Sequence, residues 1–368
     1  MTETVALRKR QWVSLPGGSC DVRLGNGVLE EASPVFKGAV GRPRVSVLLV
    51  AKDVSEDVEE LTRRQLTDAG FSVVRLSAPA GRVARNAQTA FRLMDELAQA
   101  HVTADDLMVA VGDADVLSLA SYVCAQWCGS MPLAMVPTGL TALLEAPITP
   151  RGIDVGDSEQ LLKLRPSVKH SFFDMDIALS EGLTEDVLMA RVLMVATAMC
   201  DSETAFSRLW DRTEGICAND GAILCEQLQD TLKSRGKIVS STALALRQSL
   251  TYGESFAAAL MRIVPDVAPS VARAEALRFQ ARLSAGEGQL EVDDVLAQDE
   301  ILDQLEIPYL QADIDPQELI AAVRSVRLER SNRFLLELPR KLGRVRLASV
   351  SDELMGEHVA AWCATRAK

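Results

Sequence analysis

The first half of this chain alternates short apolar runs with segments of helical periodicity, and this alternation limits the fold more than any other feature of the sequence. The apolar runs have the length of strands and cover residues 45–51, 71–76, 107–111 and 132–136. The helical segments cover residues 54–69, residues 86–100 with Asn86 as the expected N-cap, and a stretch that ends at Gln126. Such alternation predicts a parallel, doubly wound sheet with a ligand crevice beyond the carboxyl ends of its strands.

The pattern changes in the second half of the chain. A loop rich in glycine and proline is expected at residues 138–157, and a short strand at residues 171–174. Helical spacing then predicts helices over residues 187–200, 203–213, 222–232, 240–250, 256–263, 270–283 and 315–323. An apolar stretch at residues 333–338 is a candidate late strand. We therefore expect a Rossmann-like α/β domain over residues 1–175 and an all-helical domain over residues 176–368.

Charge and composition exclude several classes of function. The formal net charge of −12 and the pI of 4.9 argue against binding to a nucleic-acid backbone, which needs a basic surface. No apolar run approaches the roughly 18 residues of a membrane span, and the first residues do not form a secretory signal, so we expect a cytoplasmic protein. The seven cysteines, which include Cys124 and Cys128 one helical turn apart, form no CxxC pair and are expected to be buried, reduced thiols.

Several short stretches together carry a resemblance to a known family. They are Cys20-Asp21-Val22-Arg23-Leu24-Gly25-Asn26-Gly27, Asp53, Gly81-Arg82-Val83-Ala84-Arg85, Val136-Pro137-Thr138-Gly139-Leu140 and Leu338-Pro339-Arg340-Lys341-Leu342-Gly343. In order and spacing they resemble the 3-dehydroquinate synthase family, the sugar-phosphate cyclases of the shikimate pathway. The resemblance implies an N-terminal α/β domain that binds NAD and a C-terminal helical domain that holds a divalent metal, zinc or cobalt.

The resemblance also implies site residues. The positions for cofactor contacts are Asp53, Arg85, Gly112, Thr138 and Leu140. The positions for catalysis and for substrate anions are Glu145, Arg151, Lys233, Lys237 and Arg247. An arginine stays charged near neutral pH, so Arg151 can clamp an anion but cannot donate a proton. The basic residues are expected either to bind a phosphate or carboxylate in a cleft between the domains or to face water, and the sequence leaves both readings open.

The phosphate loop departs from the family pattern. Where the family has three glycines, this chain has Gly112-Asp113-Ala114-Asp115, which keeps one glycine and adds two carboxylates. Negative charges so close to a pyrophosphate would cost several kcal/mol unless a cation lay between them. The alternative is that Asp113 or Asp115 caps the following helix, which contributes about 1 kcal/mol. NAD is therefore implied by the resemblance but disfavoured by these residues.

The metal site departs further. The chain has three histidines, and none lies between residues 171 and 357. The family's Glu ligand corresponds to Met194, its first His ligand to Glu254, and its later His-Gly-Glu motif to Arg273-Ala274-Glu275. Ala258 stands in place of the acid–base histidine. A Glu254–Glu275 metal pair is conceivable, but carboxylates on helices are usually solvated, so we predict that no divalent metal is bound.

These observations favour one function over two others. The first is a dehydroquinate synthase-like scaffold that has lost the metal-dependent cyclase reaction and binds an anion or a partner. The alternative is an active synthase that converts a phosphorylated seven-carbon sugar acid to 3-dehydroquinate with a rebuilt site of Glu145, Glu254 and Lys233. An alcohol dehydrogenase relative would also need histidine ligands. The expected partners are a small phosphorylated or carboxylate ligand and a second copy in a homodimer, without nucleic acid or membrane.

Overall fold

The structure is a computed structural model that describes residues 7–179 and 182–367. The chain divides into two compact units, residues 1–182 and residues 183–368, whereas the sequence places the boundary after residue 175. Asp174 explains the difference, because it caps the short helix α6 (Met175–Ala178) and accepts hydrogen bonds from the backbone N–H groups of Gly27 and Leu29, both at 3.1 Å. Helix α6 is thus tied to the first unit.

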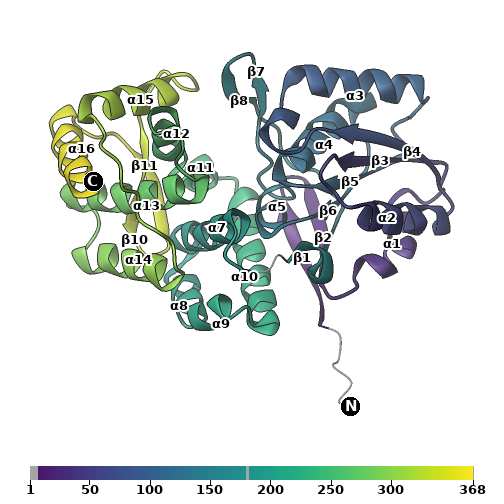
Figure 1. Cartoon of the computed structure of the whole chain (residues 1–368), viewed down its shortest axis with the longest axis horizontal. Coiled ribbons are helices and arrows are strands. Elements are labelled where there is room, and N and C mark those ends of the chain that lie inside the picture. The colour runs from purple at the N-terminus through teal and green to yellow at the C-terminus, as the bar shows by residue number, and fades with distance from the viewer. Residues whose placement is uncertain (1–6, 180–181, 368) are drawn as a thin grey trace. The chain divides into compact units, whose positions relative to one another are not determined.

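The first unit contains a parallel sheet with one antiparallel edge strand. Among the described residues seven strands form this sheet in the order β1-β2-β9-β6-β5-β3-β4 (Figure 1). Their bounds are Arg8–Leu15 (β1), Gly18–Gly25 (β2), Val45–Ala51 (β3), Ser72–Ala78 (β4), Leu107–Gly112 (β5), Leu133–Pro137 (β6) and His170–Asp174 (β9). Only β1 runs antiparallel to its neighbour within this sheet as described. The predicted parallel α/β sheet is confirmed.

Helices cover both faces of the sheet, as the apolar character of β3 requires. On one face Leu48 and Val50 of β3 pack in a core with residues of α1 (Ser33–Val40) and α2 (Glu56–Asp68). The other helices of the sheet are α3 (Ala87–Gln99) and α4 (Ala114–Gln126), and short 3-10 turns lie at Leu29–Glu31 (η1), Gly81–Ala84 (η2) and Trp127–Gly129 (η3). Asn86 caps α3 by accepting from the N–H of Thr89, as predicted.

The prediction of an irregular loop at residues 138–157 is wrong. A short helix, α5 (Leu140–Glu145), follows β6, and β7 (Ile153–Val155) pairs with β8 (Ser158–Leu162) in a hairpin. The hairpin depends on Gly152, because a Cβ at this position would lie 2.6 Å from the carbonyl oxygen of Gln160. Gly152, one of the glycines that suggested a loop, therefore allows the backbone to approach β8 closely.

The second unit is helical and includes one β-hairpin. Its helices are α7 (Glu185–Asp201), α8 (Glu203–Trp210), α9 (Thr213–Cys217), α10 (Gly221–Val239), α11 (Leu244–Ser249), α12 (Glu254–Ile263), α13 (Pro269–Gly286), α14 (Val292–Gln304), α15 (Pro316–Leu328) and α16 (Asp352–Arg366). The hairpin pairs β10 (Leu336–Lys341) with β11 (Arg344–Ala348). Helix α13 is buried over most of its length and packs against α7, α12, α14, α16 and β10. The sequence missed α9, α14, α16 and β11.

Helix α7 contains a long apolar stretch from Val187 to Cys200. Its only charged side chain between Val187 and Cys200 is Arg191, which is buried and donates hydrogen bonds to the carbonyl oxygen of Leu305 and to Glu306, both at 2.8 Å. Within residues 7–179 and 182–367, every helix is too short or too polar to cross a lipid bilayer. The apolar character of α7 therefore reflects its place in the core of the second unit.

Candidate functional site

The candidate site begins at the turn between β5 and α4, to which the family resemblance assigns the cofactor's phosphates. Gly112 ends β5 with φ at +154°, and a Cβ at this residue would lie 2.8 Å from the Cβ of Ala51. A side chain would therefore push into the neighbouring strand, so glycine is required for packing even without a ligand.

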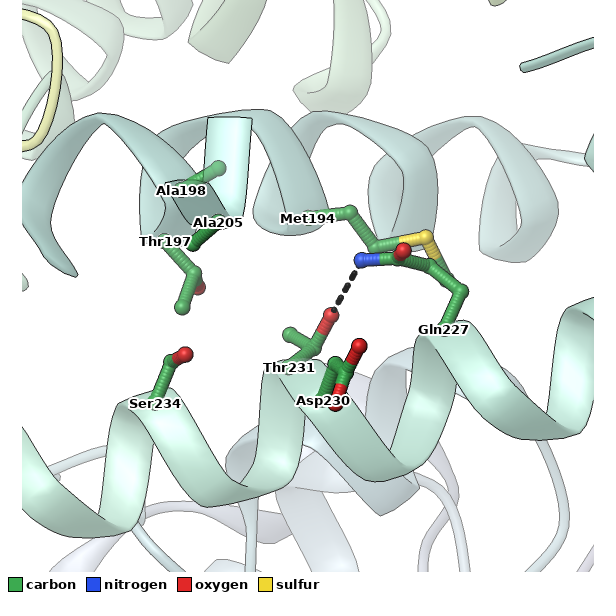
Figure 2. A pocket seen from close by; sticks show the side chains of 8 residues that line it. All are labelled: Met194, Thr197, Ala198, Ala205, Gln227, Asp230, Thr231 and Ser234. Atoms are coloured by element: carbon green, nitrogen blue, oxygen red, sulfur yellow. Dashed lines mark hydrogen bonds between the residues drawn. The ribbon is translucent and has the colours of Figure 1, made fainter. Parts of the chain in front are cut away.

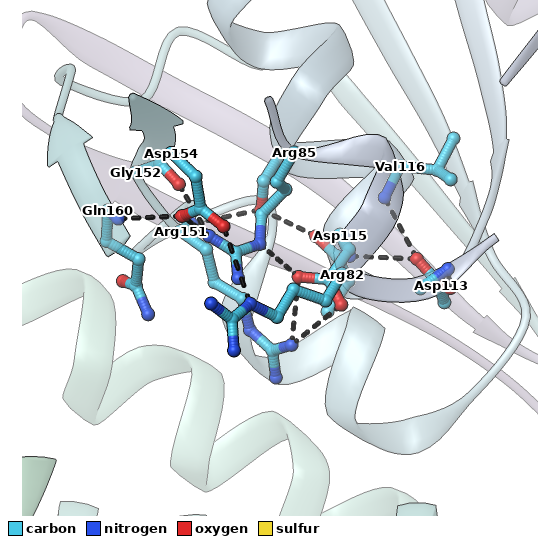
Figure 3. Close-up of polar contacts among 12 residues, drawn as sticks. Arg82, Arg85, Asp113, Asp115, Val116, Arg151, Gly152, Asp154 and Gln160 are labelled. Carbon is cyan, nitrogen blue, oxygen red and sulfur yellow. Dashed lines mark hydrogen bonds and ion pairs between the residues drawn. The ribbon is translucent and has the colours of Figure 1, made fainter. Parts of the chain in front are cut away.

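Asp113 occupies the N-terminus of α4. Its Oδ1 accepts hydrogen bonds from the backbone N–H groups of Asp115 and Val116, both at 2.9 Å, and its Oδ2 accepts from the N–H of Gly81 at 2.6 Å (Figure 3). Burial raises the pKa of Asp113 above the ordinary value, and the charge of Asp115 adds to this rise against the effect of the backbone hydrogen bonds. A helix N-terminus favours an anion, and here the anion belongs to the chain itself.

Arg85 lies behind this turn and is 3% exposed. Its Nε donates to Asp115, and its Nη1 donates to Asp154 at 3.0 Å and to the carbonyl oxygen of Gly152 at 2.7 Å. The residue expected to contact a cofactor is thus hydrogen-bonded to Asp115 of α4 and to Asp154 of the β7–β8 hairpin. Sequence analysis missed Asp154, because nothing in its local pattern distinguishes it from an ordinary turn residue.

Arg151, predicted to clamp a substrate anion, is bound by two carboxylates of the first unit. Its Nε donates to Glu145 at 2.7 Å, and its Nη1 lies 3.1 Å from each carboxylate oxygen of Asp115. Burial lowers the pKa of Arg151, but the charges of Glu145 and Asp115 raise it more, so the net pKa is raised. The predicted pair Glu145 and Arg151 therefore does come together, as an ion pair within one unit.

These contacts form one network, which we call the arginine–carboxylate cluster. Its members are Arg82, Arg85, Arg151, Asp113, Asp115, Glu145, Asp154 and Glu159. Asp113 joins it through the turn at Gly81 and the N-terminus of α4, and Arg82 lies 3.5 Å from Asp154 and 2.9 Å from Glu159. Carboxyl groups outnumber guanidinium groups in the cluster, so it offers no surplus positive charge to a phosphate.

Acidification is expected to destabilise the protein in part through Asp115. Burial raises the pKa of this carboxyl group, but the charges and hydrogen bonds of Arg151 and Arg85 lower it more, so its pKa in the folded state lies below the ordinary value. Its contribution to stability is therefore complete above the unfolded-state pKa of about 3.9 and is lost as the pH falls through the folded-state value. Melting temperatures measured from about pH 6 to about pH 3 should fall less steeply for Asp115→Asn than for the wild type.

The control for this pH series is Asp53→Asn, which changes an exposed carboxylate just beyond β3. This variant should keep the wild-type pH dependence. An equal pH dependence in Asp115→Asn and the wild type would contradict the role given to Asp115.

The remaining predicted cofactor positions lie at the same edge of the sheet. Asp53 follows β3, Thr138 follows β6, and the N–H of Thr138 donates to the carbonyl oxygen of Gly112 at 3.1 Å. Leu140 is buried at the start of α5. Because β3, β5 and β6 are parallel neighbours, their carboxyl ends place Asp53, Gly112 and Thr138 along one edge, where ligands of such sheets bind.

The predicted basic residues of the second unit have different surroundings. Lys233 and Lys237 are both exposed and lie one turn apart on α10, and Lys237 pairs with Asp201 at 2.7 Å. Arg247 on α11 donates to the carbonyl oxygens of Ser241 and Thr242, at 2.6 and 3.1 Å. The predicted grouping of these three residues with Arg151 joins two units and stays a prediction.

The positions of the family's metal ligands hold a different set of side chains. Met194 is buried, Glu254 begins α12, and Arg273 lies with its Nη1 3.7 Å from Oε1 of Glu254. A guanidinium, a thioether and one carboxylate do not fit a divalent cation that prefers histidine and carboxylate donors. Across residues 7–179 and 182–367, no three His, Cys, Asp or Glu side chains gather as a metal site would need.

Met194 also borders a small polar cavity between α7, α8 and α10 (Figure 2). The cavity is lined by Met194, Thr197, Ala198, Ala205, Gln227, Asp230, Thr231 and Ser234. Its volume of about 10 Å³ suits a single water molecule and excludes a nucleotide or a sugar phosphate. Within this lining, Nε2 of Gln227 donates a hydrogen bond to the hydroxyl of Thr231 at 3.1 Å.

Sequence comparison finds relatives named 3-dehydroquinate synthase. No family model matches the chain. The chain is 25% identical over 245 residues to a 3-dehydroquinate synthase of Thermobifida fusca, an alignment that covers 66% of this chain and 65% of the relative, slightly under two thirds of its length. It is 25% identical over 344 residues to the 3-dehydroquinate synthase of Saccharopolyspora erythraea, with 90% and 87% covered.

Solved structures show the same fold at lower identity. A 2-deoxy-scyllo-inosose synthase complexed with carbaglucose-6-phosphate, NAD+ and Co2+ superposes with a TM-score of 0.80 at 14% identity, covering 95% of this chain and 99% of that one. A 2-epi-5-epi-valiolone synthase of Streptomyces hygroscopicus with NAD+ and Zn2+ bound gives a TM-score of 0.74 at 17% identity, with 95% and 97% covered. An iron-containing alcohol dehydrogenase of Thermotoga maritima gives 0.63 at 13% identity, with 96% and 99% covered.

Proposed function

Because this chain is a diverged member of the 3-dehydroquinate synthase family, the sugar-phosphate cyclases, we propose that it keeps the family's scaffold without the metal-dependent cyclase reaction. In this proposal its role is to bind a small phosphorylated or carboxylate ligand or a protein partner. The observation that carries the proposal is the Asp113 carboxylate, which three backbone N–H groups hold at the N-terminus of α4.

The electrostatics of this turn support the proposal. Two unit charges 4 Å apart repel by about 4 kcal/mol at an effective dielectric constant of about 20. A pyrophosphate at the N-terminus of α4 would meet Asp113 in its own position, and the N–H groups of Gly81 and Val116 that would hold it already have a partner. NAD bound as the family resemblance implies does not fit this turn.

The alternative is an active dehydroquinate synthase that acts on a phosphorylated seven-carbon sugar acid through Glu145, Glu254 and Lys233. Glu145 is engaged by Arg151 at 2.6 Å, and Glu254 lies 3.7 Å from the guanidinium of Arg273. The active enzyme would need Glu145 and Glu254 as a base or as metal ligands. In the structure each of these two carboxylates lies beside an arginine of the same chain. These contacts favour the scaffold over the rebuilt enzyme.

A thermal-shift series tests the proposed function. The purified chain is melted with NAD at millimolar concentration, with zinc or cobalt, and with NAD and each metal together. A ligand at 100 times its dissociation constant would stabilise the native state by about 2.7 kcal/mol, which is a shift of several degrees. We expect no saturable shift, and no phosphate release from the phosphorylated seven-carbon sugar acid.

The positive control is the Thermobifida fusca relative, treated in the same way. Saturable stabilisation by NAD, or phosphate release that depends on the chain and survives repurification, would establish the active enzyme instead. We further propose that the protein works in the cytoplasm as a homodimer, without nucleic acid or membrane, since its net charge of −12 disfavours anionic polymers and anionic lipid surfaces.

A further inference from the structure

The second unit contains a groove whose lining residues are not part of the candidate site described above. It runs between the C-terminal end of α13 and the β10–β11 hairpin, and its volume of about 440 Å³ is within the range of small-molecule sites. Its lining consists of Glu287, Gln289, Arg333, Leu335, Leu338, Arg340, Leu347, Ala348 and Ser349. None of these residues belongs to the positions that the family resemblance assigns to cofactor, metal or substrate.

The two arginines of the groove differ from most arginines around them. Arg278 pairs with Glu275 at 3.2 Å, and Arg282 pairs with Asp299 through a bidentate contact. By contrast, within the described residues the guanidinium groups of Arg333 and Arg340 have no ion pair or hydrogen bond, and the one contact of Arg333 is made by its backbone N–H. Both guanidinium groups are therefore available to a ligand.

Arginines recur every three residues at positions 324, 327, 330 and 333, and their contacts differ in the same way. Arg324 pairs with Asp352, and Arg327 pairs with the buried Glu337 at 3.2 Å. These two arginines serve the packing of α15, whereas Arg333 lies beyond the helix on the chain segment that enters β10. The run is thus partly structural, and its last member is the one that lines the groove.

The frame that carries Arg340 is fixed against α13. The hydroxyl of Ser284 on α13 donates to the carbonyl oxygen of Pro339, the residue before Arg340. At the turn of the hairpin, Gly343 approaches the backbone of Ser202 so closely that a Cβ would lie 2.3 Å from it. Because the backbone on both sides of the groove is held in place, a ligand does not have to order it, which reduces the cost of binding.

The remaining lining residues define the ligand further. Leu335 and Leu347, both partly exposed, give the groove an apolar component, which suits a ligand with a hydrocarbon body. Glu287 contributes one negative charge, so the groove suits a single anionic group near the arginines and disfavours a polyanion. Guanidinium groups bind phosphate and carboxylate oxygens through paired N–H donors, so either oxyanion satisfies the two arginines.

We propose that this groove binds a small organic anion, with its phosphate or carboxylate at Arg333 and Arg340 and its apolar body over the leucines. The inference deepens the proposed function and rests on it in one respect, since it supplies the anion site that the scaffold would use. It does not depend on NAD, on a metal or on the arginine–carboxylate cluster.

The test is calorimetric titration of the full chain with phenyl phosphate at low ionic strength, without NAD or metal. Phenyl phosphate combines one phosphate with an apolar ring, and inorganic phosphate serves as the probe for the charge alone. We expect saturable binding of phenyl phosphate and binding of inorganic phosphate that is at least several-fold weaker. Arg333→Gln and Arg340→Gln should each weaken phenyl phosphate binding by about tenfold, and the double variant should abolish it.

The matched control is Arg344→Gln, which removes the same charge from the same hairpin at an exposed residue outside the groove. It should bind phenyl phosphate as the wild type does. Equal affinity in the double variant, an equal loss in Arg344→Gln, or no binding by the wild type would overturn the proposal. Circular dichroism melts identify any variant that fails to fold, and Arg333→Gln, at an exposed position, then decides the outcome.

The two proposals fail in different experiments. If phenyl phosphate did not bind, the proposed anion site in the groove would be rejected, and the results with NAD and metals would still test the proposed function. If NAD and a metal stabilised the protein, the proposal that the cyclase reaction is lost would be rejected. The titration of the Arg333 and Arg340 variants would still test the anion site in the groove.

Discussion

Replacing Glu275 with glutamine is expected to lower the free energy of unfolding by about 3–5 kcal/mol, because it leaves buried positive charge without its counter-charge. Glu275 is 0% exposed on α13. It lies 3.2 Å from Arg278 and accepts from Nε of Arg366 at 2.7 Å, from Nε1 of Trp362 at 3.2 Å and from the N–H of Leu310 at 3.3 Å. One carboxylate thus ties α13 to α16 and to the segment after α14.

Chemical denaturation followed by circular dichroism measures this effect as a shift of the unfolding midpoint. The matched control is Glu357→Gln, an exposed glutamate on α16, which should change the stability by less than about 0.5 kcal/mol. If both variants unfolded at the wild-type midpoint, Glu275 would not hold these helices together. The family resemblance places Glu275 beside a metal ligand, yet its contacts here are those of a structural residue.

Replacing Arg85 with methionine is expected to lower the free energy of unfolding by a similar amount, about 3–5 kcal/mol, because it leaves buried negative charge without its counter-charge. Methionine keeps much of the side-chain volume but leaves Asp115 and Asp154 in the interior without the guanidinium that joins them. Arg151 still contacts Asp115, so Asp154 and the β7–β8 hairpin should lose most. Hydrogen exchange of the backbone amides should show the loss first around Gly152 and Gln160.

Arg82 provides the control for this substitution within the same turn. Its side chain is 61% exposed, and it contacts Asp154 and Glu159 from the solvent side. Exposed pairs contribute about 0–1 kcal/mol, so Arg82→Met should be nearly neutral. If Arg82→Met lost as much stability as Arg85→Met, the burial of Arg85 would not account for its contribution to the free energy of unfolding.

Charged side chains of the chain itself occupy the regions that the family resemblance assigns to cofactors. In the first unit the carboxylate of Asp113 lies at the N-terminus of α4, and Arg85 and Arg151 are bound by carboxylates of the same unit. In the second unit the guanidinium of Arg273 lies beside Glu254. At these positions the charged side chains are thus paired with groups of the same chain.

Local sequence pattern suffices to predict some elements of this fold and not others. The run at residues 45–51 became β3 with the same bounds, and Asn86 capped α3, because continuous apolar runs and caps depend on neighbouring residues. The hairpin of β7 and β8 was missed, because its short strands are stabilised by pairing and by the close approach at Gly152. Helix α16 was missed as well, although its Ser351 cap is a local signal that could have located it.

The sequence by itself determined the class of fold and the residue types available for chemistry. Strand length and helical period are local properties, and folding cannot place a histidine between residues 171 and 357 where the chain has none. Only the tertiary structure decided which charges meet. Asp113 and Gly81 are 32 residues apart in sequence, and Arg85 and Asp154 are 69 apart. Such pairs form because parallel strands bring distant loops to one edge of the sheet, and no local pattern specifies which side chains then come within hydrogen-bonding distance.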